Sequence, residues 1–240
     1  MKQMTLDALH TDELKKSFTH KDVFNIYDIG SFYQSMEPSV PQSTVNWRIY
    51  KLVERGIIQR VGRGKYQIGG SSFFEPGITR KMIQVNRYMK KQFPYIKYIV
   101  WHIGDINTFS QHLFNKDITF VEVERDSVES VIEQLRDKFK YVQDSRTTSY
   151  LYPNESVIMV RPLVTGAPVQ TVQAIPTTTL EKILVDIYFD KVFDFFQGYE
   201  LSLIFKNAFS GYTIHKERLL RYASRKEKRA VISEFIQTIK

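Results

Sequence analysis

The chain has 240 residues, a formal net charge of +8, 42% hydrophobic and 25% charged residues, and no cysteine. This composition is typical of a globular protein with one large or two ordinary domains, and it excludes a disordered chain. Without cysteine the chain can form no disulfide, thiol nucleophile or cysteine-ligated zinc site, which favours a cytoplasmic protein. The positive charge favours a polyanionic partner or an acidic protein partner.

Nothing in the sequence indicates a targeting or membrane-spanning segment. Residues 1–16 carry too many charges for a signal peptide. No apolar run approaches the roughly 20 residues that are needed to cross a bilayer. We therefore expect a cytoplasmic protein that has no membrane partner.

Two helices are predicted before residue 37. The first covers residues 4–16, with Leu6, Leu9 and Leu14 turned inward. The second follows Ser17 or Thr19, either of which is a plausible N-cap. The apolar face of this second segment consists of Val23, Phe24, Ile26 and Tyr27.

Residues 41–69 predict a recognition helix followed by a two-stranded wing. Val45, Ile49, Leu52 and Val53 recur at the spacing of one helical face. Pro41 suits the first turn, and Gly56 suits the position just after the helix. Apolar strands at 57–61 and 66–68 flank Gly62-Arg63-Gly64, a sequence typical of a tight hairpin turn. This order is that of a winged helix-turn-helix domain.

Positive charge is concentrated in the same region. Residues 37–65 hold six basic residues and two acidic ones. We expect the helix to enter the major groove of double-stranded DNA while the wing contacts phosphates or the minor groove. The residues expected to contact DNA are Gln42, Ser43, Thr44, Asn46, Trp47, Arg48, Lys51, Arg60, Arg63 and Lys65. The alternative is a winged helix that binds a protein, with solvated charges on its surface.

Residues 69–72 (GGSS) predict a domain boundary, which divides the chain into residues 1–70 and 71–240. A helix that includes Ile78, Met82, Val85 and Met89 follows, and its many basic residues indicate a charge-coated linker. Strands are predicted at 98–103, 118–123, 150–152, 157–160 and 169–175. Helices are predicted at 106–114, at 126–139 with Asp126 or Ser127 as cap, from Leu180 after a threonine cap, and at 199–208, 214–223 and 226–239. The fold class is α+β: a winged helix, then a mixed α/β domain with a helical C-terminal third.

A metal-dependent nuclease is the sharpest enzymatic alternative. Glu122 and Glu124 would share one face of a strand, and Asp105 or Asp117 precedes them, as metal-binding carboxylates do. The lysine expected beside them is absent. The histidines have no metal-ligand spacing, and no phosphate-binding loop or nucleophile elbow occurs. We therefore expect no enzyme, no cofactor and no metal, and a regulator with a ligand-sensing body is a third possibility.

Two stretches beyond the wing carry a resemblance. Residues 100–135 contain a tryptophan near a strand end, a short helix with a late histidine, a strand ending VEVE and an amphipathic helix, with Trp101, His112, Glu122, Glu124 and Glu129 at those places. Residues 177–190 match a helix pattern sLEKLLVDl through Leu180, Glu181, Lys182, Leu184, Val185 and Asp186. Both stretches are similar to antitoxins of the abortive-infection AbiEi type, from type IV toxin–antitoxin systems. The sequence departs from that pattern at His102-Ile103-Gly104.

The resemblance implies an N-terminal winged helix that represses its own promoter and a C-terminal domain that counteracts a toxin. The toxin of that family is a nucleotidyltransferase-like enzyme encoded by a neighbouring gene. We therefore expect an autoregulating repressor that acts in phage defence as an antitoxin.

Overall fold

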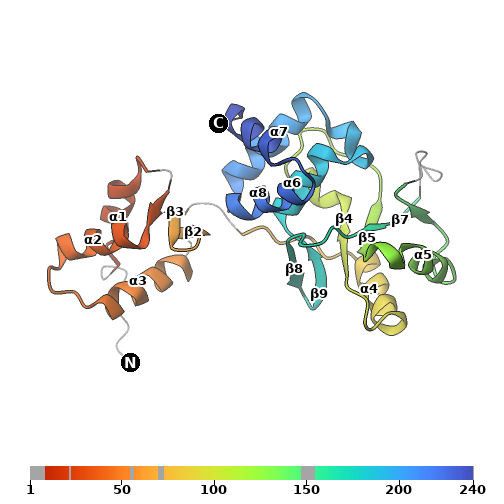
Figure 1. The fold of residues 1–240 in the computed structure, drawn as a ribbon, viewed down its shortest axis with the longest axis horizontal. Helices are drawn as coiled ribbons and strands as arrows, with labels where there is room; N and C mark the ends of the chain where they lie inside the picture. The colour runs from red at the N-terminus through yellow and green to blue at the C-terminus, as the bar shows by residue number, and fades with distance from the viewer. Residues whose placement is uncertain (1–8, 22, 55–56, 70–72, 147–154, 240) are drawn as a thin grey trace. The chain divides into compact units, whose positions relative to one another are not determined.

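The computed structural model describes residues 9–21, 23–54, 57–69, 73–146 and 155–239. The chain divides into two compact units, the first of Met1–Phe73 with Phe209–Glu217, and the second of Phe74–Ala208 with Arg218–Lys240 (Figure 1). The mixed α+β class predicted from the sequence is confirmed. The predicted boundary at residues 70–71 lies outside the described residues. No helix in the described ranges has the length and apolar character needed to cross a membrane.

The first unit combines three N-terminal helices with a small antiparallel sheet in strand order β1-β3-β2. Its elements are α1 (Thr11–Phe18), β1 (Phe24–Asn25), α2 (Ile26–Met36), α3 (Gln42–Glu54), β2 (Ile58–Gly62) and β3 (Lys65–Ile68). Its core joins Leu14 of α1, Ile29 of α2 and Leu52 of α3, all with no exposed surface. This is the order of helices and hairpin that the sequence predicts.

The start of α2 differs from the prediction. Asn25 is its N-cap: the side chain accepts hydrogen bonds from the N–H groups of Tyr27 and Asp28, and the Asp28 carboxylate accepts one from the Asn25 N–H. The predicted caps Ser17 and Thr19 are wrong, because both lie at the C-terminal end of α1. For the helix predicted at 4–16, α1 begins only at Thr11, and residues 4–8 are outside the described part.

The hairpin predicted after the α3 helix is confirmed. β2 and β3 pair with Gly62 opposite Lys65, so Arg63 and Gly64 form a two-residue turn. Gly64 has a φ of 66°, a left-handed conformation that glycine adopts without the steric cost that a Cβ atom brings. The predicted Gly56 cap lies among the residues that are not described.

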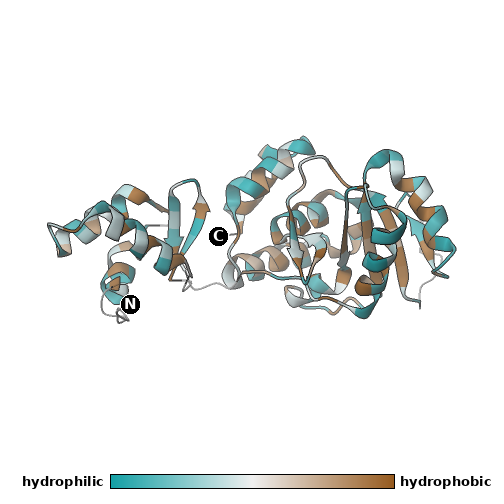
Figure 2. Cartoon of the chain, turned by 90° about the horizontal axis from the view of Figure 1, so that it is seen from below, coloured by the Kyte–Doolittle hydropathy of each residue, from teal (hydrophilic) through white to brown (hydrophobic). Residues whose placement is uncertain are grey.

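The second unit is built on a four-stranded mixed sheet with strand order β4-β5-β7-β6. Helices lie on both sides of this sheet, and hydrophobic residues colour much of it brown in Figure 2. The elements up to the last strand are α4 (Arg80–Gln92), β4 (Tyr98–His102), η2 (Ile103–Thr108), β5 (Ile118–Val123), η3 (Arg125–Ser127), α5 (Val128–Arg136), β6 (Val142–Asp144), β7 (Val157–Pro162), β8 (Val169–Val172) and β9 (Ile175–Thr178). β4 runs antiparallel to β5, whereas β5, β7 and β6 are parallel.

Alternate residues of each strand face opposite sides of the sheet, which gives its two faces different chemistry. One face is apolar: Val100 and Val121 pack in one cluster with Met82 of α4 and Val131 of α5. The opposite face carries Trp101, Phe120, Glu122 and Arg161, and it is covered by α6 (Leu180–Phe189) and η4 (Lys191–Phe196), as the contacts of Lys182 and Phe193 show. Glu122 and Arg161 therefore lie buried on the side of the sheet that α6 covers.

Several predicted elements are corrected. α4 is no linker, because Met82, Val85 and Met89 have no exposed surface and pack in the core. The helix predicted at 106–114 is wrong: the 3-10 helix η2 ends at Thr108, and residues 109–114 are irregular. The strand predicted at 169–175 is instead β8, which ends at Val172 and forms a hairpin with β9. α5 starts at Val128 without a side-chain cap from Ser127. β6 was not predicted, and the strand at 150–152 falls outside the described residues.

The helical C-terminal third is confirmed. Thr179 caps α6, since its hydroxyl accepts from the Lys182 N–H at 3.4 Å. The remaining helices are α7 (Tyr199–Gly211), α8 (Lys216–Arg225) and α9 (Arg229–Thr238).

Candidate nucleic-acid interface and buried ionic network

The outward face of α3 is polar and aromatic. Val45, Ile49 and Leu52 turn into the core. The residues that the same helix exposes are Gln42, Ser43, Asn46, Trp47 and Tyr50. Trp47 is 40% exposed and Tyr50 62% exposed, values that are high for such large rings. This face offers amide and hydroxyl groups for base edges, with rings available for apolar contact.

A shallow cavity of about 360 Å³ lies between α2 and α3. Its walls include Tyr27, Ser31 and Gln34 of α2 and Gln42 and Asn46 of α3. The Gln42 amide donates to the Asn46 side chain at 3.2 Å, so these two predicted contact residues lie side by side. The exposed faces of α2 and α3 thus form one continuous polar surface.

The prediction for Arg48 is wrong. Arg48 is 3% exposed, and its Nη2 donates to both carboxylate oxygens of Glu37, at 2.8 and 3.0 Å. Its guanidinium lies 4.7 Å from the centre of the Tyr33 ring. The Arg48 hydrogen bond lowers the pKa of Glu37. Arg48 therefore fixes α3 against the end of α2 and is not available to DNA.

The other predicted contact residues are distributed over helix and wing. Thr44 and Lys51 are half-buried on α3, with the Lys51 ammonium 5.5 Å from the Tyr50 ring. Arg60 and Arg63 are exposed on β2 and the turn. Lys65 is exposed too, but its Nζ is 3.5 Å from the Glu217 carboxylate, which compensates part of its charge. The hairpin therefore exposes more positive charge than α3, whose Arg48 is buried.

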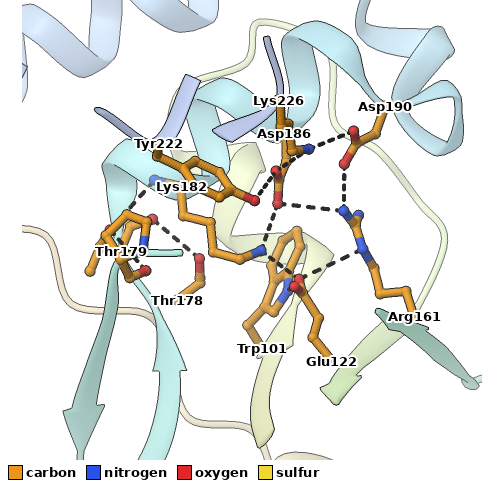
Figure 3. A network of polar contacts seen from close by, with 11 residues as sticks. Trp101, Glu122, Arg161, Thr178, Thr179, Lys182, Asp186, Asp190, Tyr222 and Lys226 are labelled. Atoms are coloured by element: carbon orange, nitrogen blue, oxygen red, sulfur yellow. Dashed lines mark hydrogen bonds and ion pairs between the residues drawn. The ribbon is translucent and has the colours of Figure 1, made fainter. Parts of the chain in front are cut away.

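The second unit contains a buried ionic network. Lys182 of α6 has no exposed surface, and its Nζ lies 2.6 Å from both Glu122 of β5 and Asp186 of α6. Glu122 also accepts from the Trp101 indole N–H at 2.7 Å. Figure 3 shows these side chains meeting between the sheet and α6. The carboxylate of Glu122 thus joins β4 to β5, and the ammonium of Lys182 joins β5 to α6.

Arg161 extends the network toward the surface. It lies opposite Glu122 in the β5–β7 register and pairs with Asp190, and its Nη2 is 3.6 Å from Asp186. Lys226 pairs with Asp186 at 2.7 Å and with Asp190 at 2.6 Å (Figure 3). The three acids and three bases of this network balance in formal charge.

The electrostatics of the network follow from its burial. Burial alone would raise the pKa of Asp186, but the charges of Lys182, Lys226 and Arg161 hold it well below its usual range. Burial and the charge of Asp186 raise the pKa of Tyr222, whose hydroxyl donates to Asp186 at 2.8 Å. The arrangement is therefore structural ion pairing, in which the carboxylate of Asp186 is ionised at neutral pH and held by cations.

Sequence reasoning singled out Glu122, Lys182 and Asp186 but missed Arg161, Asp190, Tyr222 and Lys226. The sequence contained a signal for two parts of the network. Lys182 and Asp186 stand four residues apart in a mainly apolar helix, and Arg161 interrupts an apolar strand. Charges at such positions are buried and must find partners.

The acids proposed for a nuclease do not converge. Glu122 belongs to the ionic network, whereas Glu124 lies beyond the end of β5 and is exposed, so the expected shared strand face is wrong. Asp117 is 2.8 Å from the Nε2 of His102. Asp105 is buried and accepts a hydrogen bond from the Gly77 N–H. In the described ranges no three His, Asp or Glu side chains are grouped to hold a metal ion.

The His102-Ile103-Gly104 segment forms a turn held by its own histidine. The Nδ1 atom of His102 accepts from the Gly104 N–H at 3.0 Å, which leaves the Nε2–H to donate to Asp117. Trp101 just before it stacks on Phe120 with ring centres 4.4 Å apart. The hydrogen bonds of His102 and the stacking of Trp101 therefore hold the end of β4 against the β5 side of the sheet.

Comparison with known families gives one match. A model described as "Family of unknown function (DUF6577)" matches residues 44–240, which include most of α3, the hairpin and all of the second unit. No protein among the curated ones matches the sequence.

Replacing Lys182 by methionine tests the ionic network. The change leaves Glu122 and Asp186 buried without the ammonium between them, so we expect a loss of about 3–5 kcal/mol in the free energy of unfolding. Urea denaturation followed by circular dichroism measures it. The control is Lys91→Met, at an exposed position of α4. A loss below about 1 kcal/mol, similar to that of an exposed pair, would contradict the role given to Lys182.

Asp105 predicts a pH effect on stability. Burial raises its pKa to about 6, although the Gly77 N–H donates to it at 2.8 Å. Because the folded-state pKa is raised, the contribution of Asp105 to stability is full below about pH 4 and is lost as the pH rises through about 6. We expect Asp105→Asn to remove this loss of stability. Between about pH 4 and pH 7 the variant should gain roughly 1–3 kcal/mol in the free energy of unfolding relative to the unchanged protein. The measurement is urea denaturation at both pH values, and the control is Asp12→Asn at an exposed position. If the stability of Asp105→Asn and that of the unchanged protein changed with pH in parallel, this prediction would be refuted.

Proposed function

The chain belongs to the DUF6577 family, and because that family has no assigned function, we propose a function from its geometry: a DNA-binding transcriptional regulator. The observation that carries the proposal is the exposed α3 face of Gln42, Ser43, Asn46 and Trp47, next in sequence to a hairpin with two exposed arginines. We propose that the first unit is a winged helix and that α3 enters the major groove of duplex DNA.

The division of labour within the first unit supports this proposal. Arg48 and Glu37 hold α3 rigidly against α2, so the outward side chains of α3 are presented on a fixed scaffold. Gln42 and Asn46 can form paired hydrogen bonds with adenine edges, and Trp47 can contact a thymine methyl group. Arg60 and Arg63 carry no sequence information themselves but attract the phosphate backbone.

The regulator is proposed to act as an antitoxin as well, on the strength of the resemblance to AbiEi-type antitoxins. Four residues that carry this resemblance in two separate stretches contact one another in a chain: Trp101 with Glu122, Glu122 with Lys182, and Lys182 with Asp186. This favours a shared structural core. Because these side chains are buried, they cannot contact a toxin, and the surface that does so lies elsewhere on the second unit. The proposed setting is the cytoplasm, where the operator DNA and a toxin encoded by a neighbouring gene would be reached.

The wing is tested by its effect on salt dependence. For Arg60→Ala with Arg63→Ala we expect binding to weaken similarly for operator and unrelated duplexes. We also expect the slope of log affinity against log salt to fall by about two units, one for each phosphate that the variant no longer neutralises. Fluorescence anisotropy with a labelled duplex measures both quantities.

Lys15→Ala with Lys16→Ala is the matched control, because it removes two exposed charges from α1 of the same unit. An unchanged slope for the arginine variant, or equal weakening by both variants, would remove the wing assignment. The first unit would then be tested as a protein-binding module.

The antitoxin role is tested by co-expression. If the neighbouring gene encodes a toxin, its expression alone should arrest growth, and co-expression of this chain should restore it. Asn46→Ala in the chain should reduce promoter repression and leave the rescue intact, since we assign the two activities to different units. Failure to restore growth with a folded, expressed chain would count against the antitoxin role and leave DNA binding untouched.

A further inference from the structure

The second unit contains a cavity of about 500 Å³ beside the ionic network. Its walls come from β7, from the start of η4 and from the α8–α9 junction. The charged residues that line it are Arg125, Arg161, Asp190, Lys191, Lys226 and Lys228. Five of these six side chains are cationic, which marks the cavity as a place for an anion.

The charge of the cavity is only partly neutralised by the network. Arg161 and Lys226 belong to the network, where three bases balance three acids. Arg125, Lys191 and Lys228 are exposed at the cavity and add three positive charges. Asp190 is the acidic residue among the described residues that line the cavity, and it is already paired with Arg161 and Lys226. An anion that enters the cavity therefore meets a net positive field with low-dielectric walls.

A second, independent observation points to a ligand. Arg161 is only 6% exposed, and within the described residues its Nη1 has no hydrogen-bond partner. A buried donor without an acceptor is destabilising, and a charged one more so. Arg161 forms part of the cavity wall, and an anionic oxygen that binds within hydrogen-bond distance of Nη1 would satisfy this donor.

The remaining wall suits an organic molecule. Phe189 lines the cavity, and the Lys228 ammonium lies 5.9 Å from the centre of its ring. The volume of about 500 Å³ falls within the range of small-molecule sites. A cavity lined by one aromatic ring and five cationic side chains matches a ligand with a flat apolar part and a phosphate.

We propose that this cavity binds the phosphate group of a small molecule, with Arg161, Lys191 and Lys228 as its contacts. The ligand would thereby join β7 to η4 and to the α8–α9 junction. Its binding stabilises the second unit, because it engages the folded state alone. The site is independent of the proposed DNA-binding face, since all of its residues belong to the second unit.

The test is isothermal titration of the full chain with inorganic phosphate, AMP and adenosine at constant ionic strength. We expect phosphate and AMP to bind, AMP more tightly, and adenosine not to bind. AMP should raise the melting temperature. Binding of phosphate as tight as that of AMP would overturn the assignment to a small molecule and give the site to the free anion, whereas absence of binding by both at millimolar concentration would overturn the proposal altogether.

The variant Lys191→Gln with Lys228→Gln should weaken AMP binding by about tenfold or more, as expected when charge-assisted hydrogen bonds are removed. Both side chains lie outside the ionic network, so the fold should be retained. Lys91→Gln with Lys206→Gln removes the same charge from exposed positions of the second unit away from the cavity. Equal weakening by the two variants would show general charge attraction and overturn the proposal. Duplex binding should be unchanged in both, which separates this test from that of the proposed function.

Discussion

The second unit depends on one ammonium group buried between two carboxylates. Lys182 is fully buried, and its Nζ lies 2.6 Å from both Glu122 and Asp186. An unpaired charge at this depth would cost several kcal/mol, so the sheet strand and the helix that supply these groups must stay in register. The same constraint positions Arg161 and Lys226, which carry the network to the wall of the cationic cavity. The same ionic network therefore holds the core together and positions two side chains at the wall of the proposed anion site.

A buried, paired charge also organises the first unit. Arg48 is buried against Glu37 and Tyr33, and it holds α3 to α2. A positive charge that the sequence assigns to DNA is thus used for folding. What remains for the proposed DNA recognition is an exposed polar and aromatic helix face, with exposed positive charge on the hairpin at Arg60 and Arg63. This separation matches readout of bases by the helix and of phosphates by the hairpin.

The elements with a strong local signal could be predicted from the sequence. The periodicity of α3, the turn at Arg63-Gly64, the strands β4 and β5 and the Thr179 cap all depend on nearby residues. The same periodicity already places Arg48 on the buried face, because it stands three residues after Val45. β6 could not be predicted because its three residues are too few to show a strand pattern. The candidate sites show the same limit: Lys182 and Asp186 are four residues apart, but Arg161, Tyr222 and Lys226 meet Asp186 only through the tertiary fold.

The proposed function depends on the exposed face of α3 reading DNA sequence. The decisive measurement is fluorescence anisotropy of the purified full chain with the duplex upstream of its own gene, against a scrambled duplex of equal length and composition. We predict binding to the upstream duplex that is at least about a thousandfold tighter than to the scrambled one and that weakens steeply with salt. Equal, weak binding to both duplexes would contradict this function, because the first unit would then attract DNA only through its charge.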